Sequence, residues 1–158
     1  MSKVITFSTS FMKNHPKAGE PTHFVEKIIA GMLQNPAMKN HQSLCGYDNL
    51  ALMDCHLPKS TTIRAGKNWS VGDKFSPRIW SGRPYCSPQK QICDDIEIKR
   101  VYDFKYNGFF WINGNIVSTS ELITVANNDG LTLEDFWAWF KKSHFEGQLL
   151  VWDERIYY

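Results

Sequence analysis

The residues best suited to chemistry lie in one short run, Lys59-Ser60-Thr61-Thr62-Ile63-Arg64, which combines an amine, hydroxyls and a guanidinium. Lys59 can act as a base near pH 7 only if its surroundings lower its pKa by roughly three units from about 10.4. A hydroxyl such as that of Thr62 attacks a carbonyl only when a base activates it. If Lys59 stays protonated, it can instead hold an oxyanion or a phosphate. The run therefore predicts either a catalytic group or a cationic binding edge.

The geometry of a strand sets a condition on this run. In extended backbone, alternate side chains share a face, so Thr62 and Arg64 lie together while Ile63 faces the core. Lys59 precedes Thr62 by three positions, which places it on the opposite face of a fully extended strand. Lys59 and Thr62 can act together only if the chain bends near Ser60.

Cations and aromatic side chains alternate in and after this run. A positive charge and a flat ring together suit phosphate groups and bases. The candidate binding residues are Arg64, Lys67, Trp69, Lys74, Arg78, Trp80, Arg83 and Tyr85. Glycine and proline interrupt the same segment, which favours exposure of Trp69, Trp80 and Tyr85.

Composition limits the classes of protein that fit. The 158 residues are 42% hydrophobic and 14% aromatic, enough to fill one core, so we expect one domain over 1–158. A net charge of +2 is too small for a dedicated duplex binder, and any polyanion site must come from local clustering. No run approaches about 18 apolar residues, and the N-terminus is too polar for a signal peptide. We therefore expect a cytoplasmic protein with no membrane contact.

The cysteines give no metal motif. Cys45, Cys55, Cys86 and Cys93 show no C-x-x-C spacing, and His56 is the one histidine adjacent to a cysteine. Free thiols are the expected state, with a Cys55, His56, Cys86 and Cys93 zinc site as the alternative. We predict neither a metal nor a cofactor.

Apolar residues recur at helical spacing in two segments. The first predicts a helix over about 22–33 with Thr22 as its N-cap. In the second, Thr132-Leu133-Glu134-Asp135 resembles a capping box and begins a helix that continues to Phe140. Apolar residues show no regular helical or strand spacing at about 34–56, and we expect an inserted loop there with at most one short helix around 48–53.

Strand signals fill most of the remaining chain. Asn107-Gly108 and Asn113-Gly114 each separate apolar residues, which predicts a three-stranded meander from about 91 to 117. Alternation predicts a first strand around residues 4–8 and a last one over 148–152. These elements define an α+β protein, a small curved sheet or β-barrel with two to three flanking helices.

The Lys-x-x-Thr-Ile-Arg run, followed by the turn at Gly72-Asp73, resembles the ASCH family, the activating-signal-cointegrator homology domains. Their fold is similar to the PUA RNA-binding β-barrel. Within the family, the run is most similar to that of the bacterial amidohydrolases of N4-acetylcytidine, whose lysine and threonine correspond to Lys59 and Thr62.

In those enzymes a later acidic residue completes the proposed catalytic set, shortly before a helix rich in Thr and Leu at its start. Asp129 occupies the equivalent place here, although Asn-Asp-Gly is also typical of a turn. The resemblance covers about 57–74 and 119–137. The chain departs from the family pattern at Leu57, where glycine is frequent, and at Asp129, which replaces glutamate.

Three functions follow as expectations. The leading one is an RNA-, nucleotide- or modified-nucleoside-binding domain, with a cleft formed by Lys59–Arg64, the Arg78–Tyr85 loop and Asp129. The alternative is an amidohydrolase of N-acylated cytidine or a related amide, in which Lys59, Thr62 and Asp129 are catalytic. The third is a phage or host protein-interaction module that uses the 34–56 insertion. The expected partner of the first two is RNA or a nucleotide-like small molecule.

Overall fold

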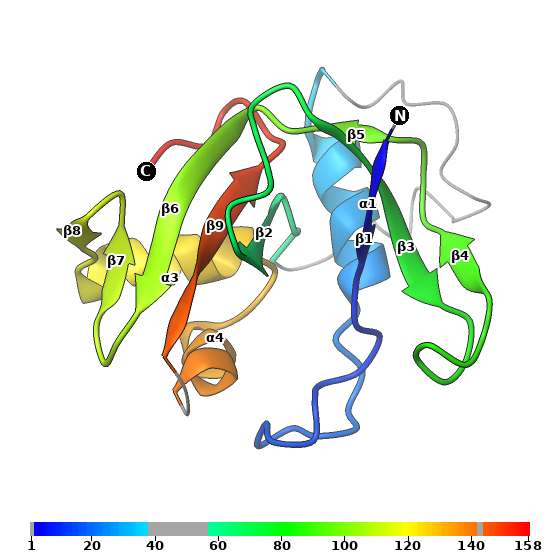
Figure 1. The fold of residues 1–158 in the computed structure, drawn as a ribbon, viewed down its shortest axis with the longest axis horizontal. Helices are drawn as coiled ribbons and strands as arrows, with labels where there is room; N and C mark the ends of the chain where they lie inside the picture. The colour runs from blue at the N-terminus through cyan, green and yellow to red at the C-terminus, as the bar shows by residue number, and fades with distance from the viewer. Residues whose placement is uncertain (1, 38–56, 142–143) are drawn as a thin grey trace.

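The computed structural model describes residues 2–37, 57–141 and 144–158. Over this part of the chain, the protein is an α+β structure with three helices and two β-sheets (Figure 1). In chain order, the elements are β1 (Lys3–Thr6), α1 (Phe24–Gln34), β2 (Thr61–Ala65), β3 (Lys74–Trp80), β4 (Gln89–Gln91), β5 (Ile96–Glu97), β6 (Arg100–Tyr106), β7 (Phe110–Ile112), β8 (Asn115–Ile116), α3 (Thr119–Asn128), α4 (Leu133–Phe140) and β9 (Phe145–Val151).

The strands form two separate hydrogen-bonded sheets. The four-stranded sheet has the order β1-β3-β4, with β5 also paired to β3, and β1 runs parallel to β3. The five-stranded sheet has the order β2-β9-β6-β7-β8 and is antiparallel throughout. Neither sheet closes into a barrel within the described residues. Of the two architectures expected, the sheet flanked by helices fits, and the closed β-barrel does not.

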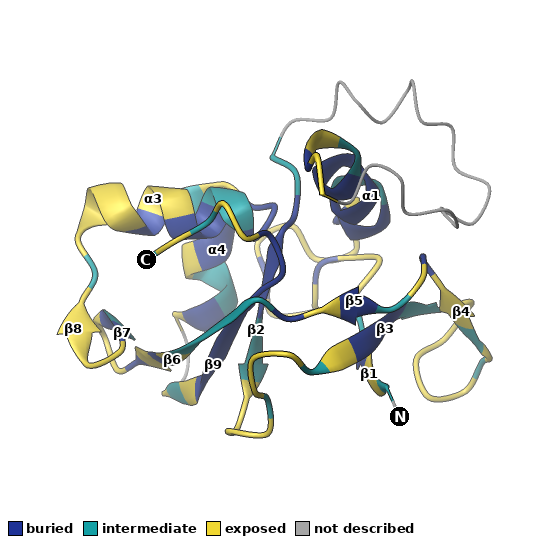
Figure 2. Ribbon diagram, turned by 90° about the horizontal axis from the view of Figure 1, so that it is seen from above, coloured by how far each residue is buried: buried dark blue, intermediate teal, exposed yellow. Residues whose placement is uncertain are grey.

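The helices lie on one side of the strands and turn their buried faces towards them (Figure 2). Helix α1 buries Ile28 and Ile29 completely, and α4 does the same with Phe136. One cluster of buried apolar side chains includes residues from both sheets and all three helices. Burial of each such side chain contributes about 1.5–3 kcal/mol to the stability of the fold. This shared cluster therefore holds the two sheets against the same helices.

The two predicted helices are present. Helix α4 begins after Thr132, whose hydroxyl accepts a hydrogen bond from the Asp135 backbone N–H at 3.2 Å, as the capping pattern predicts. Helix α1 begins two residues later than predicted, and its N-cap is His23 rather than Thr22. The Thr22 hydroxyl accepts a hydrogen bond from the Phe24 backbone N–H at 3.3 Å and donates one to the Ser8 carbonyl at 2.6 Å, which ties the preceding loop to this helix start.

Helix α3 was missed by the prediction from sequence. It begins with a complete capping box: the Ser118 hydroxyl accepts from the Glu121 backbone N–H, and the Glu121 carboxylate accepts from the Ser118 backbone N–H. The Ser-x-x-Glu signature was therefore visible in the sequence. Its first turns are mostly exposed, which weakened the apolar period that would have marked it.

The predicted meander is confirmed for β6, β7 and β8, which are joined at the two Asn-Gly pairs. It begins at Arg100 rather than near residue 91, because β4 and β5 pair with β3 in the other sheet. The last strand is present but starts earlier, at Phe145, and lies between β2 and β6.

Part of the expected organisation lies outside the described residues. This holds for most of the 34–56 insertion, for its short helix at 48–53, for Cys45, and for Cys55 and His56 of the alternative zinc site. Within the described ranges, no group of three or more His, Cys, Asp and Glu side chains is arranged to hold a metal ion. None of the helices in those ranges has the length and apolar character needed to cross a bilayer.

Candidate active site

Two segments that are 70 residues apart in the chain meet at the candidate site. Lys59, just before β2, forms an isolated antiparallel bridge with Asp129, the residue that ends α3. The Ser60 N–H donates to the Asn128 carbonyl at 2.8 Å, and the Lys59 N–H donates to the Lys27 carbonyl of α1 at 2.9 Å. Backbone hydrogen bonds to two helices therefore fix the position of the Lys59 backbone independently of its side-chain contacts.

The backbone around the bridge is tight. Gly130 has a φ of 79°, and a Cβ at this position would lie 3.1 Å from Lys59 Cβ. Leu57 has a φ of 56°, a left-handed conformation that costs a residue with a Cβ roughly 1–2 kcal/mol. A glycine at this position would avoid this cost.

The Lys59 and Asp129 side chains form a buried ion pair. Lys59 Nζ lies 2.5 Å from Asp129 Oδ1 and also donates to the Asp129 backbone carbonyl at 2.9 Å. The exposed fractions of the two side chains are 3% and 10%. The ammonium lies over two rings, 4.4 Å from the centre of Phe24 and 5.7 Å from that of Phe7. Carboxylate, carbonyl and π faces thus replace the water that Lys59 loses.

Burial dominates the protonation of both partners. It lowers the pKa of Lys59 against the opposing effect of the Asp129 carboxylate, and the nearby Arg64 and Lys27 lower it further. Burial also raises the pKa of Asp129, against the opposing effect of Lys59. Both shifts favour the neutral forms, so proton transfer from Nζ to Oδ1 is easier here than between the same groups in water.

A cavity of about 110 Å³ adjoins the pair. Thr62 lines this cavity together with Lys59 and is itself buried, so the two residues do converge. The condition set by strand alternation is met because β2 begins only at Thr61, after Lys59. The lining residues are Thr6, Phe7, Ser8, Phe24, Lys59, Thr62, Ile63, Arg64, Asp129, Leu131, Trp139 and Phe140.

Arg64 supplies the second cation of the cavity. Its Nη2 donates to the Thr6 carbonyl at 3.0 Å, and its guanidinium lies 5.1 Å from the centre of the Phe7 ring. Burial lowers its pKa to about 10. Its Nε is buried and has no hydrogen-bond partner among the described residues. An unpaired buried donor costs about 1–3 kcal/mol.

The other predicted binding residues lie outside this cavity. Trp69 packs edge-on against Phe75 in the core, with ring centres 6.3 Å apart, and exchanges hydrogen bonds with Gln148. Lys74, Arg78 and Trp80 belong to β3, and Arg83 and Tyr85 belong to the hairpin loop that follows it. The structure therefore assembles Lys59, Thr62, Arg64 and Asp129 and places the remaining candidates elsewhere.

The aromatic walls of the cavity were not predicted as site residues. Phe7 follows β1, Phe24 opens α1, and Trp139 is near the end of α4. Each belongs to a different segment, and each has the sequence signature of an ordinary core residue. No local spacing could distinguish them from the rest of the core.

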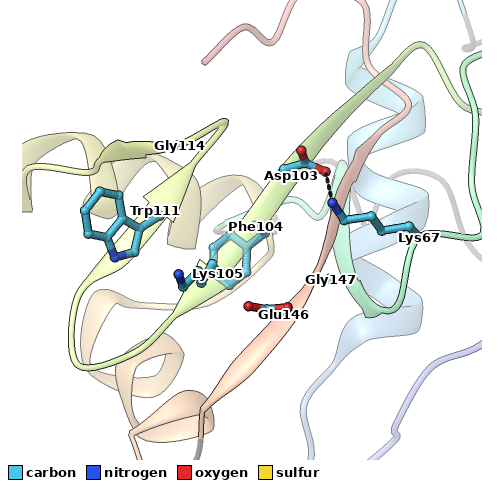
Figure 3. Close-up of a pocket in the computed structure, with 8 residues that line it drawn as sticks. All are labelled: Lys67, Asp103, Phe104, Lys105, Trp111, Gly114, Glu146 and Gly147. Carbon is cyan, nitrogen blue, oxygen red and sulfur yellow. Dashed lines mark ion pairs between the residues drawn. The ribbon is translucent and has the colours of Figure 1, made fainter.

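Lys67 lies in a separate groove of about 350 Å³ over the five-stranded sheet (Figure 3). Its Nζ is 3.8 Å from Asp103 Oδ1, and both side chains are mainly exposed. Across the groove, Lys105 Nζ lies 5.9 Å from the Trp111 ring, and Glu146 adds another carboxylate. The charges of this groove are balanced and solvated, in contrast to the buried groups at Lys59.

Comparisons of this chain with protein-family models, with curated proteins and with solved structures find no significant match. The resemblance to the ASCH family therefore stays a prediction. What the fold and site define is a class: a small α+β protein with an amine, a carboxylate and a hydroxyl enclosed at one cavity.

Proposed function

We propose that this protein is an amidohydrolase that cleaves a small N-acyl group from an amine such as the exocyclic nitrogen of cytosine. The observation that supports the proposal is the buried Lys59–Asp129 pair, which adjoins a cavity that Thr62 also lines. A base with a lowered pKa beside a hydroxyl is the arrangement that nucleophilic catalysis needs.

In the proposed reaction, Lys59 Nζ in its neutral form takes the proton of the Thr62 hydroxyl as Oγ1 attacks the acyl carbon. The oxygen of the acyl group gains negative charge, and the guanidinium of Arg64, which lines the cavity, stabilises it. The carbon–nitrogen bond then breaks, and Lys59 returns its proton to the leaving amine. A water molecule hydrolyses the Thr62 ester in the same way and releases the carboxylic acid.

Asp129 has a positioning role in this scheme. Its carboxylate and its backbone carbonyl both bind Lys59 Nζ, so they fix the direction of the amine lone pair or proton. The carboxylate also raises the pKa of Lys59 and limits the effect of burial. Asp129 thereby keeps the pKa of Lys59 within the pH range in which the proposed enzyme works, so that Lys59 can both take up and release a proton.

The size of the cavity supports a small reacting group. Cavities that enclose drug-sized ligands measure about 300–1,000 Å³, whereas this one measures about 110 Å³. It can hold an acyl group and the adjoining nitrogen between the rings of Phe7, Phe24 and Trp139, while the rest of the substrate stays at the surface. The binding cleft first expected for RNA would need the Arg78–Tyr85 loop, and those residues do not line this cavity.

The test is turnover of a panel of N4-acylated cytidines, with acetyl, propionyl and benzoyl groups, followed by chromatography of the free nucleoside. We expect the acetyl compound to react fastest, Thr62→Val to lose activity, and Thr62→Ser to retain part of it. Two variants outside the cavity serve as controls: Thr124→Val, matched to Thr62→Val at an exposed position of α3, and Lys17→Met, at a half-exposed lysine paired with Asp135. Both should react at the wild-type rate.

Mass spectrometry of the quenched reaction provides a second measurement. An acyl adduct on the peptide that contains Thr62, absent in Thr62→Val, is the expected result. No turnover of any panel member, or equal turnover by Thr62→Val and wild type, would refute the proposal.

A further inference from the structure

The hairpin of β3 and β4, residues 74–91 and here called the basic hairpin, concentrates the positive charge of the protein. The chain has 18 Lys and Arg against 16 Asp and Glu, a net charge of +2. Four of the basic residues, Lys74, Arg78, Arg83 and Lys90, lie between Asp73 and Asp94 with no acidic residue among them. The rest of the chain therefore carries a net charge of −2, so the basic hairpin is a segment to which a polyanion would be drawn.

The same hairpin presents aromatic rings to solvent. The Trp80 and Tyr85 ring centres are 5.1 Å apart with the planes tilted by 48°, and the side of the pair formed by Tyr85 is open, because that residue is 87% exposed. Tyr85 has a φ of 62°, which is unusual for a bulky side chain. A large apolar ring held in water by a strained backbone is typical of a binding surface rather than of a core.

Hydrogen bonds within the loop hold this arrangement. The Ser81 N–H and hydroxyl both donate to the Pro88 carbonyl, at 2.9 and 2.8 Å. The Ser87 hydroxyl accepts from the Gly82 N–H at 3.0 Å and donates to the Arg83 carbonyl at 2.8 Å. The loop that carries Tyr85 is thus organised before any ligand arrives, which reduces the entropy lost on binding.

We propose that the basic hairpin is a binding site for single-stranded nucleic acid, with bases stacked on Tyr85 and Trp80 and phosphates on the surrounding cations. Unpaired bases expose the faces that such rings bind, whereas a duplex buries them in its own stack. An acidic peptide would match the charge but would leave the aromatic pair unused. This binding site does not depend on the proposed hydrolase activity.

The basic hairpin adjoins the cavity at Lys59 through β1. Arg78 is paired with Thr6 in the parallel ladder, and the Phe7 N–H donates to the Arg78 carbonyl at 2.8 Å. Thr6 and Phe7 also line the cavity. A strand bound along the hairpin would therefore pass next to the cavity, which could take an acyl group carried by one of its bases.

The test is binding of a fluorescein-labelled 12-nucleotide oligouridine, followed by anisotropy at 50 and 200 mM NaCl with the full chain. Tyr85→Ala should weaken binding at least about fivefold, since one base stack is lost. Arg83→Gln should reduce the slope of log affinity against log salt by about 0.7, the value for one phosphate of a single strand. The matched controls are Phe109→Ala, an aromatic residue at the tip of another hairpin, and Lys105→Gln on the five-stranded sheet, and both should bind as wild type does.

Trp fluorescence of the wild-type protein gives a measurement that needs no variant, and we expect oligouridine to quench it. Competition with a duplex of the same length and with an acidic dodecapeptide decides between ligands, and neither should displace oligouridine at tenfold excess. Equal binding by Tyr85→Ala and wild type, displacement by the peptide or the duplex, or no binding at 50 mM NaCl would each overturn the proposal. Because binding is measured without hydrolysis, its failure is distinct from failure of the hydrolase proposal.

Discussion

Two lysine–aspartate pairs in this protein differ in their surroundings far more than in their geometry. Lys59 Nζ and Asp129 Oδ1 are 2.5 Å apart, and Lys17 Nζ and Asp135 Oδ2 are 2.8 Å apart. Each aspartate has a side chain that is 10% exposed. The lysines differ: 48% of the Lys17 side chain is exposed, against 3% for Lys59. Access of the ammonium to water is thus the variable that separates the two pairs.

The consequence is an opposite pKa shift in the two lysines. The hydrogen bond with Asp135 raises the pKa of Lys17, whereas burial lowers that of Lys59 despite an equally close carboxylate. The helices add to the contrast. Asp135 lies in the first turn of α4, where the helix dipole favours a carboxylate, and Asp129 lies at the C-terminal end of α3, where it does not. In one pair the lysine keeps its access to water, and in the other burial favours the neutral forms of both groups.

The largest expected effect comes from removal of one carboxylate. Asp129→Ala leaves the buried Lys59 without its counter-ion and should cost about 3–5 kcal/mol of unfolding free energy. Asp135→Ala leaves Lys17 in water and should cost no more than about 1 kcal/mol. Urea denaturation followed by circular dichroism measures both. Equal losses would mean that burial does not distinguish the pairs.

A double variant tests the origin of that loss. Lys59→Met/Asp129→Leu removes both buried charges, and apolar groups of similar volume often replace such pairs without loss of stability. We expect it to regain most of the stability that Asp129→Ala loses while catalysing nothing. A double variant that is no more stable than Asp129→Ala would show that packing, not the unpaired charge, caused the loss.

The close approach at Gly130 should have the next largest effect. Gly130→Ala introduces a Cβ at a φ of 79° and 3.1 Å from Lys59 Cβ, whereas Gly72→Ala introduces one at a φ of 91° with no atom within 4 Å. Both variants should be destabilised by about 1 kcal/mol or more through backbone strain. Only Gly130→Ala should also displace Lys59, and its kcat should fall while that of Gly72→Ala does not. Equal kinetics in the two variants would exclude a positioning role for Gly130.

The pH dependence of the proposed reaction should respond to the Lys59–Asp129 pair and not to the Lys17–Asp135 pair. The rate should rise as Lys59 loses its proton, at a pH below the ordinary lysine value of 10.5. The Asp129 carboxylate raises the pKa of Lys59, so Asp129→Asn should lower it further and move the rising limb of kcat/KM to lower pH. Asp135→Asn should leave the limb in place. A shift of the Asp129→Asn limb to higher pH would show that Lys59 is not the group that titrates.

Salt should have the smallest effect and should act on one pair only. In a double-mutant cycle, the coupling of Lys17 with Asp135 should be about 0.2–1 kcal/mol and should fall in 1 M NaCl, where the Debye length is about 3 Å. The coupling of Lys59 with Asp129 should not change, because no ions enter between them. A salt-dependent coupling of the buried pair would indicate that water reaches Lys59.

Local patterns in the sequence predicted the elements that depend on local chemistry. The capped start of α4 at Thr132 and the hairpins at the two Asn-Gly pairs are confirmed, because caps and tight turns are decided within a few residues. The Ser118 capping box of α3 belongs to the same category and could have been found. The pairing of β4 and β5 with β3 could not, because the choice of a strand partner depends on the whole sheet.

The sequence by itself determined which functional groups are present at residues 59–64 and that Asp129 follows them at the end of a polar segment. Only the tertiary structure decided that Lys59 is buried, that Asp129 is its partner and that the rings of Phe7, Phe24 and Trp139 enclose the cavity. The physical reason is desolvation. The pKa of a lysine depends on how much water the folded chain removes from it, and segments far apart in the sequence remove that water together.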